Sequence, residues 1–229
     1  MNVFRVWWIS TAALVLVLAT MSPAAPQNPP GSSSTKLLPK SAPVAAFPTA
    51  LPGGKTDGVN HVLEVLGWLG KYEQDGHNPA NKINFRLPES IVNEYLAYAL
   101  RINPRPGLSS VTLKLLPNNE ISSLVWIDFD AIEKWNSRLL PSPLRPFLNG
   151  KKAVLVNAQL EARDGSLNYT LKTASGPAGD MIATKVMEGI MQVIGLHQRE
   201  QYHVGKQPIP LPFGLKRMSC EKQILVGET

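Results

Sequence analysis

The sequence predicts an α+β domain in which an antiparallel sheet packs against helices on one of its faces. Two stretches, 111–129 and 154–171, alternate apolar and more polar residues on either side of a turn, as β-hairpins do. Two others, 88–102 and 180–198, carry apolar residues at helical spacing. Because strands and helices do not alternate singly, an antiparallel sheet is favoured over a parallel one.

The first 25 residues have the pattern of an export signal, either a signal peptide (1–25) or a signal anchor. Arg5 precedes an uncharged stretch over 6–21, and Ser22 and Ala24 are placed for cleavage after Ala24. The stretch is short for a membrane span, which needs about 20 residues. We expect a periplasmic or secreted protein, with the membrane as a partner if the signal is uncleaved.

Residues 26–58 are predicted to be a linker, because they are rich in Pro, Ser, Gly and Ala. Such a segment buries too little apolar surface to offset the entropy lost on ordering. The remaining chain, 59–229, is expected to form a single α+β domain. The hydrophobic content of 44% suffices for a buried core.

Charge and cysteine content exclude some functions. The net charge is +6, half of it within 1–58, and no run of Lys and Arg exceeds a pair. A nucleic-acid partner is therefore not expected, while weak attraction to an anionic membrane stays open beside ordinary solubilising charge. Cys220 is the lone cysteine, so neither an intramolecular disulfide nor a cysteine-based zinc site can form.

Three helices are expected before the long one at 180–198. The first spans 59–73 and is weakened by Gly67 and Gly70. The second is 88–102, with Pro88 at its first position. The third, short helix covers 132–140.

The strands are expected as two hairpins followed by extended chain. The first hairpin turns at 117–120 and continues to Phe129, and the second turns at Asp164-Gly165. The prolines of 207–212 force an extended backbone, and 215–220 and 223–226 supply the last strands.

The helix expected at 180–198 is apolar around more than half of its circumference. Packing on one sheet needs a stripe only about 100° wide, so part of this helix needs another apolar partner. The first helix, a second subunit or acyl chains could serve, or the helix simply covers the sheet. Methionines suit an adaptable apolar surface. The predicted groove residues are Met181, Val186, Met187, Ile190, Met191, Ile194 and Met218.

No catalytic signature appears, and neither an enzyme, a metal site nor a cofactor is expected. The chain lacks H-E-x-x-H, G-x-S-x-G and Walker A patterns. Asp128 and Asp130 would share a strand face if the strand persists, although solvated strand-end charges are the plainer interpretation. A hydrolase would need a pocket in which at least two of four polar side chains meet: Asp128, Asp130, His197 and His203. Four basic residues could contact lipid phosphates or simply belong to a solvated loop: Arg138, Arg145, Lys151 and Lys152.

Three features of the chain occur together: the stretch 87–96, LPESIVNEYL, the stretch 211–218, LPFGLKRM, and the pair of predicted hairpins around a short helix. Together they resemble bacterial envelope proteins with TULIP-like (tubular lipid-binding) domains. The first stretch is similar to the opening helix of that family, and the second to the start of its last strand. The resemblance covers about 84–227 and implies a curved antiparallel sheet around a long helix, an apolar groove between them and no catalytic residues. The helix at 59–73 and the late position of the methionine-bearing helix depart from it.

The expected function is binding of a lipid or other apolar envelope molecule in a groove between sheet and helix. The alternative is a structural or scaffolding domain of an envelope complex with a filled core and an exposed apolar patch. The two differ in whether the wide apolar helix face meets a ligand space or packed side chains.

Overall fold

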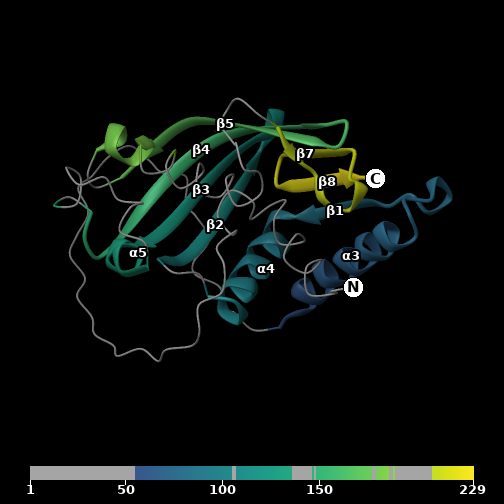
Figure 1. Ribbon diagram of the computed structural model, residues 1–229, viewed down its shortest axis with the longest axis horizontal. Coiled ribbons are helices and arrows are strands. Elements are labelled where there is room, and N and C mark those ends of the chain that lie inside the picture. Colours follow the sequence, from purple (N-terminus) through teal and green to yellow (C-terminus); the bar gives the residue numbers. More distant parts are fainter. Residues whose placement is uncertain are drawn as a thin grey trace.

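The computed structural model describes residues 55–104, 107–135, 146, 148–176, 179–185, 188 and 208–229. These residues form one eight-stranded sheet, all of whose paired strands are antiparallel, and α3 (Asp57–Gln74) and α4 (Glu89–Ile102) lie below it in the view of Figure 1. The α+β class and the antiparallel sheet are therefore confirmed. The expected long helix is described only at 180–185 and 188, where it is helical.

Four long strands form a meander: β2 (Leu108–Leu116), β3 (Glu120–Asp128), β4 (Lys151–Arg163) and β5 (Ser166–Ser175). Both expected hairpins are present. In the second, Asp164 and Gly165 have φ of 50° and 75°, and positive φ at both central residues is what a tight type I′ turn requires. The first hairpin turns through the 3-10 helix η2 (Pro117–Asn119).

A smaller group of strands extends the sheet: β7 (Arg217–Glu221), β8 (Ile224–Glu228) and β1 (Asn84–Pro88), in the order β1-β8-β7-β4-β3-β2. β4 pairs with β3 up to Gln159 and with β7 at Ala162. A two-residue strand, β6 (Ile209–Pro210), pairs with the start of β5. Strand β1 was not predicted, while β7 and β8 match the strands expected at the end of the chain.

Helix α3 (Asp57–Gln74) begins after Thr56, whose side chain accepts a hydrogen bond from the Val59 amide at 3.2 Å. It runs through Gly67 and Gly70, because its apolar stripe is buried: Val59, Val62, Val65, Leu69 and Tyr72. The expected helix is thus confirmed and is longer at its start.

Helix α4 (Glu89–Ile102) lies beside the edge of β2. The buried Asn93 side chain accepts from the Leu113 amide at 2.7 Å and donates to the Leu113 carbonyl at 2.9 Å, and the Glu89 carboxylate accepts from the Leu115 amide at 2.6 Å. These side chains satisfy backbone groups that an edge strand would leave free. Pro88 is extended (φ −56°, ψ 144°) and ends β1, so it precedes the helix and is not its first residue.

Helix α5 (Phe129–Trp135) follows β3 directly, so Phe129 belongs to this helix and not to the strand. Two further 3-10 helices are η1 (Pro79–Asn81) and η5 (Pro212–Gly214).

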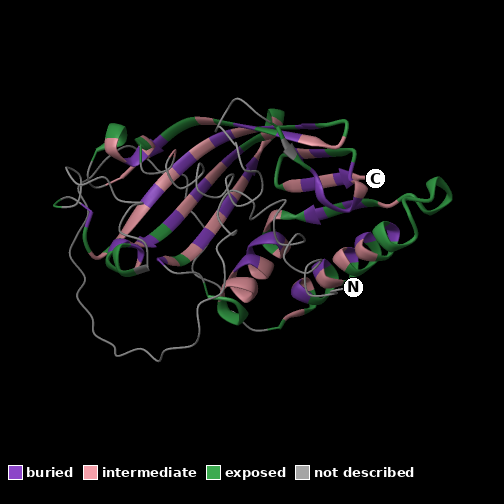
Figure 2. Cartoon of the chain, in the orientation of Figure 1, coloured by how far each residue is buried: buried purple, intermediate pink, exposed green. Residues whose placement is uncertain are grey.

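Figure 2 shows buried and less buried residues alternating along β2, β3 and β4, as expected where one face of a sheet covers the core. Within the described ranges, no helix combines the length and apolar character needed to cross a bilayer.

Candidate apolar binding site

The core-facing side of β2 to β5 is a continuous apolar surface, which we call the inner face. The alternation of each strand turns every second side chain toward it. Among the described residues, no charged side chain is buried anywhere in the molecule. The inner face consists of Val111, Leu113, Leu115, Ile121, Ser123, Val125, Ile127, Val154, Val156, Ala158, Leu160, Ala162, Leu167, Tyr169 and Ala174. Such a surface suits hydrocarbon and disfavours an ion.

Short side chains occupy the middle of the inner face. One cross-strand row joins Leu113, Ser123, Val156 and Ala174, which are register partners in β2, β3, β4 and β5. A parallel row joins Val111, Val125 and Val154. Because serine, alanine and valine project little above a sheet, this region stays shallow and smooth.

The beginning of the expected long helix contacts the inner face. A Cβ placed on Gly176 would lie 3.4 Å from the Cβ of Ala183 and 3.7 Å from Cγ2 of Val154. Ala183 is buried, and Ile182 packs against the core. The helical residues 180–185 therefore approach β4 closely where Gly176 leaves room.

The structure describes two of the seven predicted groove residues. Met218 is buried in β7, opposite Ala162 of β4 and Gly227 of β8. Met181 is 78% exposed, because Ile182 and Ala183 occupy the inward side of this turn. The other five lie outside the described residues: Val186, Met187, Ile190, Met191 and Ile194. The groove as a set therefore stays a prediction.

Tyr169 is the unusual polar residue of the inner face. Tyr169 is 5% exposed, and its hydroxyl has no hydrogen-bond partner among the residues that the structure describes. Burial raises the pKa of this phenol above its ordinary value, so the group stays protonated at neutral pH. An unpaired buried hydroxyl costs about 1–3 kcal/mol of stability. In the sequence, Tyr169 is one of the alternating residues of a predicted strand, and nothing in that alternation marks its hydroxyl as unpaired.

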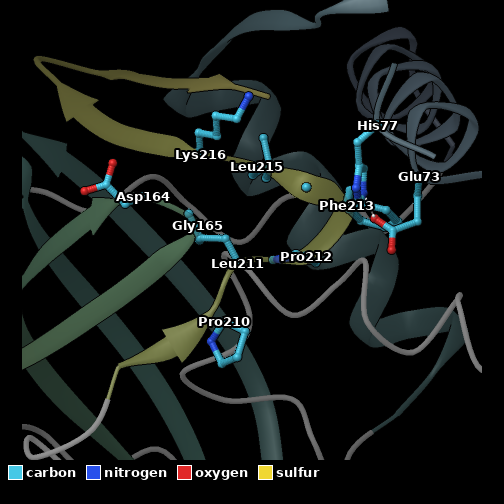
Figure 3. Close-up of a pocket in the computed structure, with 11 residues that line it drawn as sticks. Glu73, His77, Asp164, Gly165, Pro210, Leu211, Pro212, Phe213, Leu215 and Lys216 are labelled. Atoms are coloured by element: carbon cyan, nitrogen blue, oxygen red, sulfur yellow. Dashed lines mark hydrogen bonds and ion pairs between the residues drawn. The ribbon is translucent and has the colours of Figure 1, made fainter. Parts of the chain in front are cut away.

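A hollow of about 670 Å³ lies between the end of α3, the β4–β5 turn at Asp164 and Gly165, and residues 210–216 (Figure 3). Glu73 and His77 meet there at 2.9 Å, and a Cβ on Gly214 would lie 2.5 Å from the His77 ring. Both members of this pair are about half-exposed. The residues lining the hollow include no serine, threonine, cysteine or tyrosine, so they offer no hydroxyl or thiol nucleophile.

The predicted polar candidates have structural roles where they are described. Asp128 accepts from the Ala131 amide at 3.0 Å at the start of α5, and Asp130 accepts from the Gly150 amide at 3.0 Å. The two do not share a strand face, because the strand ends at Asp128. His197, His203, Arg138 and Arg145 lie outside the described residues, and of the two lysines Lys151 is exposed and Lys152 half-buried.

Cys220 is a buried, free cysteine. Burial raises the pKa of the Cys220 thiol to about 12, so it is protonated and unreactive at neutral pH. Its backbone amide donates to the Asn119 side chain at 2.8 Å. The described residues contain no group of three or more His, Cys, Asp or Glu side chains placed to hold a metal ion.

No protein-family model matches this chain, and no curated protein or solved structure matches it either. Among the described residues, the features that bear on function are the inner face and the unpaired Tyr169 hydroxyl.

Proposed function

We propose that this chain is an exported envelope protein that binds a lipid or other apolar envelope molecule and catalyses no reaction. The binding site in this proposal is a groove between the inner face and the helix expected over 180–198. The observation that carries the proposal is the inner face, which is apolar across four adjacent strands and has no buried charge beside it among the described residues. The resemblance to TULIP-like domains points the same way.

The energetics favour an acyl chain as the ligand. Moving a methylene group from water to an apolar surface contributes about 0.8 kcal/mol. A chain of a dozen methylenes therefore offers about 10 kcal/mol before the cost of association is subtracted. A helix whose apolar surface exceeds what one sheet can cover provides the opposite wall of such a site.

The scaffolding alternative is favoured by the outer face of the sheet. Trp126 is 40% exposed there, and its register partner in β4 is Ala153. Leu124 and Leu155 lie directly opposite each other and are both half-buried. Exposed aromatic and aliphatic side chains on adjacent strands form the kind of patch that binds another protein.

The decisive experiment uses the full chain purified from the cell envelope. Native mass spectrometry and lipid extraction should find bound lipid, and Ile190→Asp should abolish it by placing a charge on the apolar face of the helix. Ile102→Asp is the matched control, because it makes the same chemical change at a residue that is 51% exposed at the end of α4. Circular dichroism would establish that both variants are folded.

A different outcome would favour the scaffold. A full chain that carries no lipid and does not take up fluorescent fatty acids contradicts the binding proposal. In that case Trp126→Ala is expected to release a protein partner in cross-linking experiments on intact envelopes. If Ile190→Asp carries as much lipid as the wild type, the binding site does not include the helix expected over 180–198.

A further inference from the structure

The Tyr169 hydroxyl stands apart from the other polar groups in the interior. Asn93 is paired twice with the backbone of Leu113, and the Thr229 hydroxyl accepts from the Ile83 amide at 3.0 Å. The Tyr72 hydroxyl donates to the His77 carbonyl at 3.3 Å. Tyr169 alone has a buried side-chain atom without a partner among the described residues. Buried polar groups are nearly always paired, and no group of the described residues serves here, so the partner is either a bound molecule or a group of the remaining chain.

Tyr169 occupies a distinctive place in the sheet. It lies opposite Leu160 of β4, and Leu167 and Leu171 are its neighbours on the same side of β5. Strand β6 pairs only with Ser166 and Leu167, so the described pairing on this edge of β5 stops just before Tyr169. The hydroxyl thus belongs to an apolar surface next to the part of the β5 edge for which the described residues provide no paired strand.

The protonation state defines what the hydroxyl can bind. A phenol that stays protonated at neutral pH donates one hydrogen bond, and it needs an acceptor. A carboxylate would bring a full charge into the interior, where the described residues include no buried cation to balance it. A neutral carbonyl oxygen accepts the hydrogen bond without that cost, and hydrocarbon next to it matches Leu160, Leu167 and Leu171.

We infer that the Tyr169 hydroxyl donates a hydrogen bond to an ester carbonyl of an uncharged acyl lipid bound on the inner face. This inference rests on the proposed function and names its ligand class. The ester group would be fixed at β5, and its acyl chains would extend over the short side chains of the inner face.

Two lipids that differ only in the carbonyl test the inference. Dioleoylglycerol carries ester carbonyls, and its dioleyl ether analogue does not. Binding to the full chain is measured by displacement of a fluorescent acyl probe. Tyr169→Phe should weaken binding of the ester about three- to tenfold and leave binding of the ether unchanged. Tyr98→Phe makes the same chemical change in α4 and should alter neither affinity.

The outcomes separate this inference from the proposed function. If neither lipid binds the wild-type chain, the proposed function is wrong. If both bind and Tyr169→Phe changes their affinities equally or not at all, the hydroxyl has another partner and only the inference falls. Oleate binding more tightly than the ester at neutral pH would overturn the choice of an uncharged ligand. Folding is checked independently, because removing an unpaired hydroxyl should leave the ligand-free protein at least as stable.

Discussion

At the scale of single residues, several polar side chains in this protein have structural roles that the residue type alone does not indicate. Asp128 and Asp130 could be read as a carboxylate pair, yet each accepts a hydrogen bond from a backbone amide at a turn. Asn93 is a helix residue that completes the edge of a strand. Tyr169 is an ordinary strand residue in sequence and an unpaired donor in the fold. The roles of Asp130 and Asn93 depend on partners that lie 20 residues away in the chain, so local patterns could not reveal them.

Asn93→Ala should be strongly destabilising. It removes two hydrogen bonds and leaves the buried amide and carbonyl of Leu113 without partners. We expect the free energy of unfolding to fall by about 2–4 kcal/mol. Asn60→Ala is the control, because Asn60 is exposed on α3. Urea denaturation of both variants checks this, and equal stabilities would show that water replaces the Asn93 side chain.

Because of Cys220, the free energy of unfolding is expected to fall as the pH becomes alkaline. Its pKa is raised from 9.0 to about 12 in the folded protein, so the unfolded chain loses this proton first as the pH rises. The stabilising contribution is complete below pH 9 and is lost between pH 9 and 12. Cys220→Ala should therefore flatten the decline of unfolding free energy between pH 9 and 10, as measured by denaturant titration. Parallel curves for variant and wild type would contradict the role of the thiol.

At the scale of elements, predictability follows the distance in sequence between partners. The hairpin of β4 and β5 was predictable because Asp164 and Gly165 fix the turn and the alternating residues pair with near neighbours. Strand β1 was missed because only five residues, with Phe85 and Leu87 inward, carry its pattern. Its partner β8 lies at the other end of the domain. The expected groove rests on residues of which only Met181 and Met218 are described.

The contact between β8 and β1 leaves no room for a side chain at Gly227. A Cβ there would lie 2.2 Å from Cζ of Phe85. Gly227→Ala should thus destabilise the protein by about 1–3 kcal/mol through overpacking. Phe85→Leu combined with Gly227→Ala should recover part of this loss, which a double-mutant cycle would measure.

Gly70 of α3 provides the matched control for Gly227. A Cβ at Gly70 would meet nothing within 4 Å. Gly70→Ala should stabilise the protein by about 0.5–1 kcal/mol, because alanine is the better helix former. A loss of stability at Gly70 as large as that at Gly227 would show that steric contact is not the cause.

At the scale of the whole molecule, the N-terminal region and the domain are expected to be separable. Helix α3 begins at Asp57 after its cap Thr56, so residues 56–58 at the end of the predicted linker belong to the domain, and the described core begins with Val59. Deleting residues 26–55 should change the melting temperature little in a thermal scan followed by circular dichroism. The full-length chain is the reference, and a large drop would assign the segment a part in the fold.

Export is the other prediction at this scale. The expected signal of 1–25 should bring a C-terminally tagged chain into the envelope or medium fraction, and N-terminal sequencing should separate cleavage after Ala24 from retention as an anchor. Replacing residues 6–21 by a polar stretch is the control and should keep the chain in the cytoplasm. Recovery of the intact chain only from the cytoplasm contradicts this.

The pairing of β1 with β8 fixes when such a chain can finish folding. If the chain is exported N-terminus first, β1 crosses the membrane well before its five backbone partners, Ile224 to Glu228. The β4–β5 hairpin can form during translocation, since its contacts are local. In such a chain the β1 edge of the sheet stays unpaired until Ile224 to Glu228 have crossed, and only then can the sheet be completed.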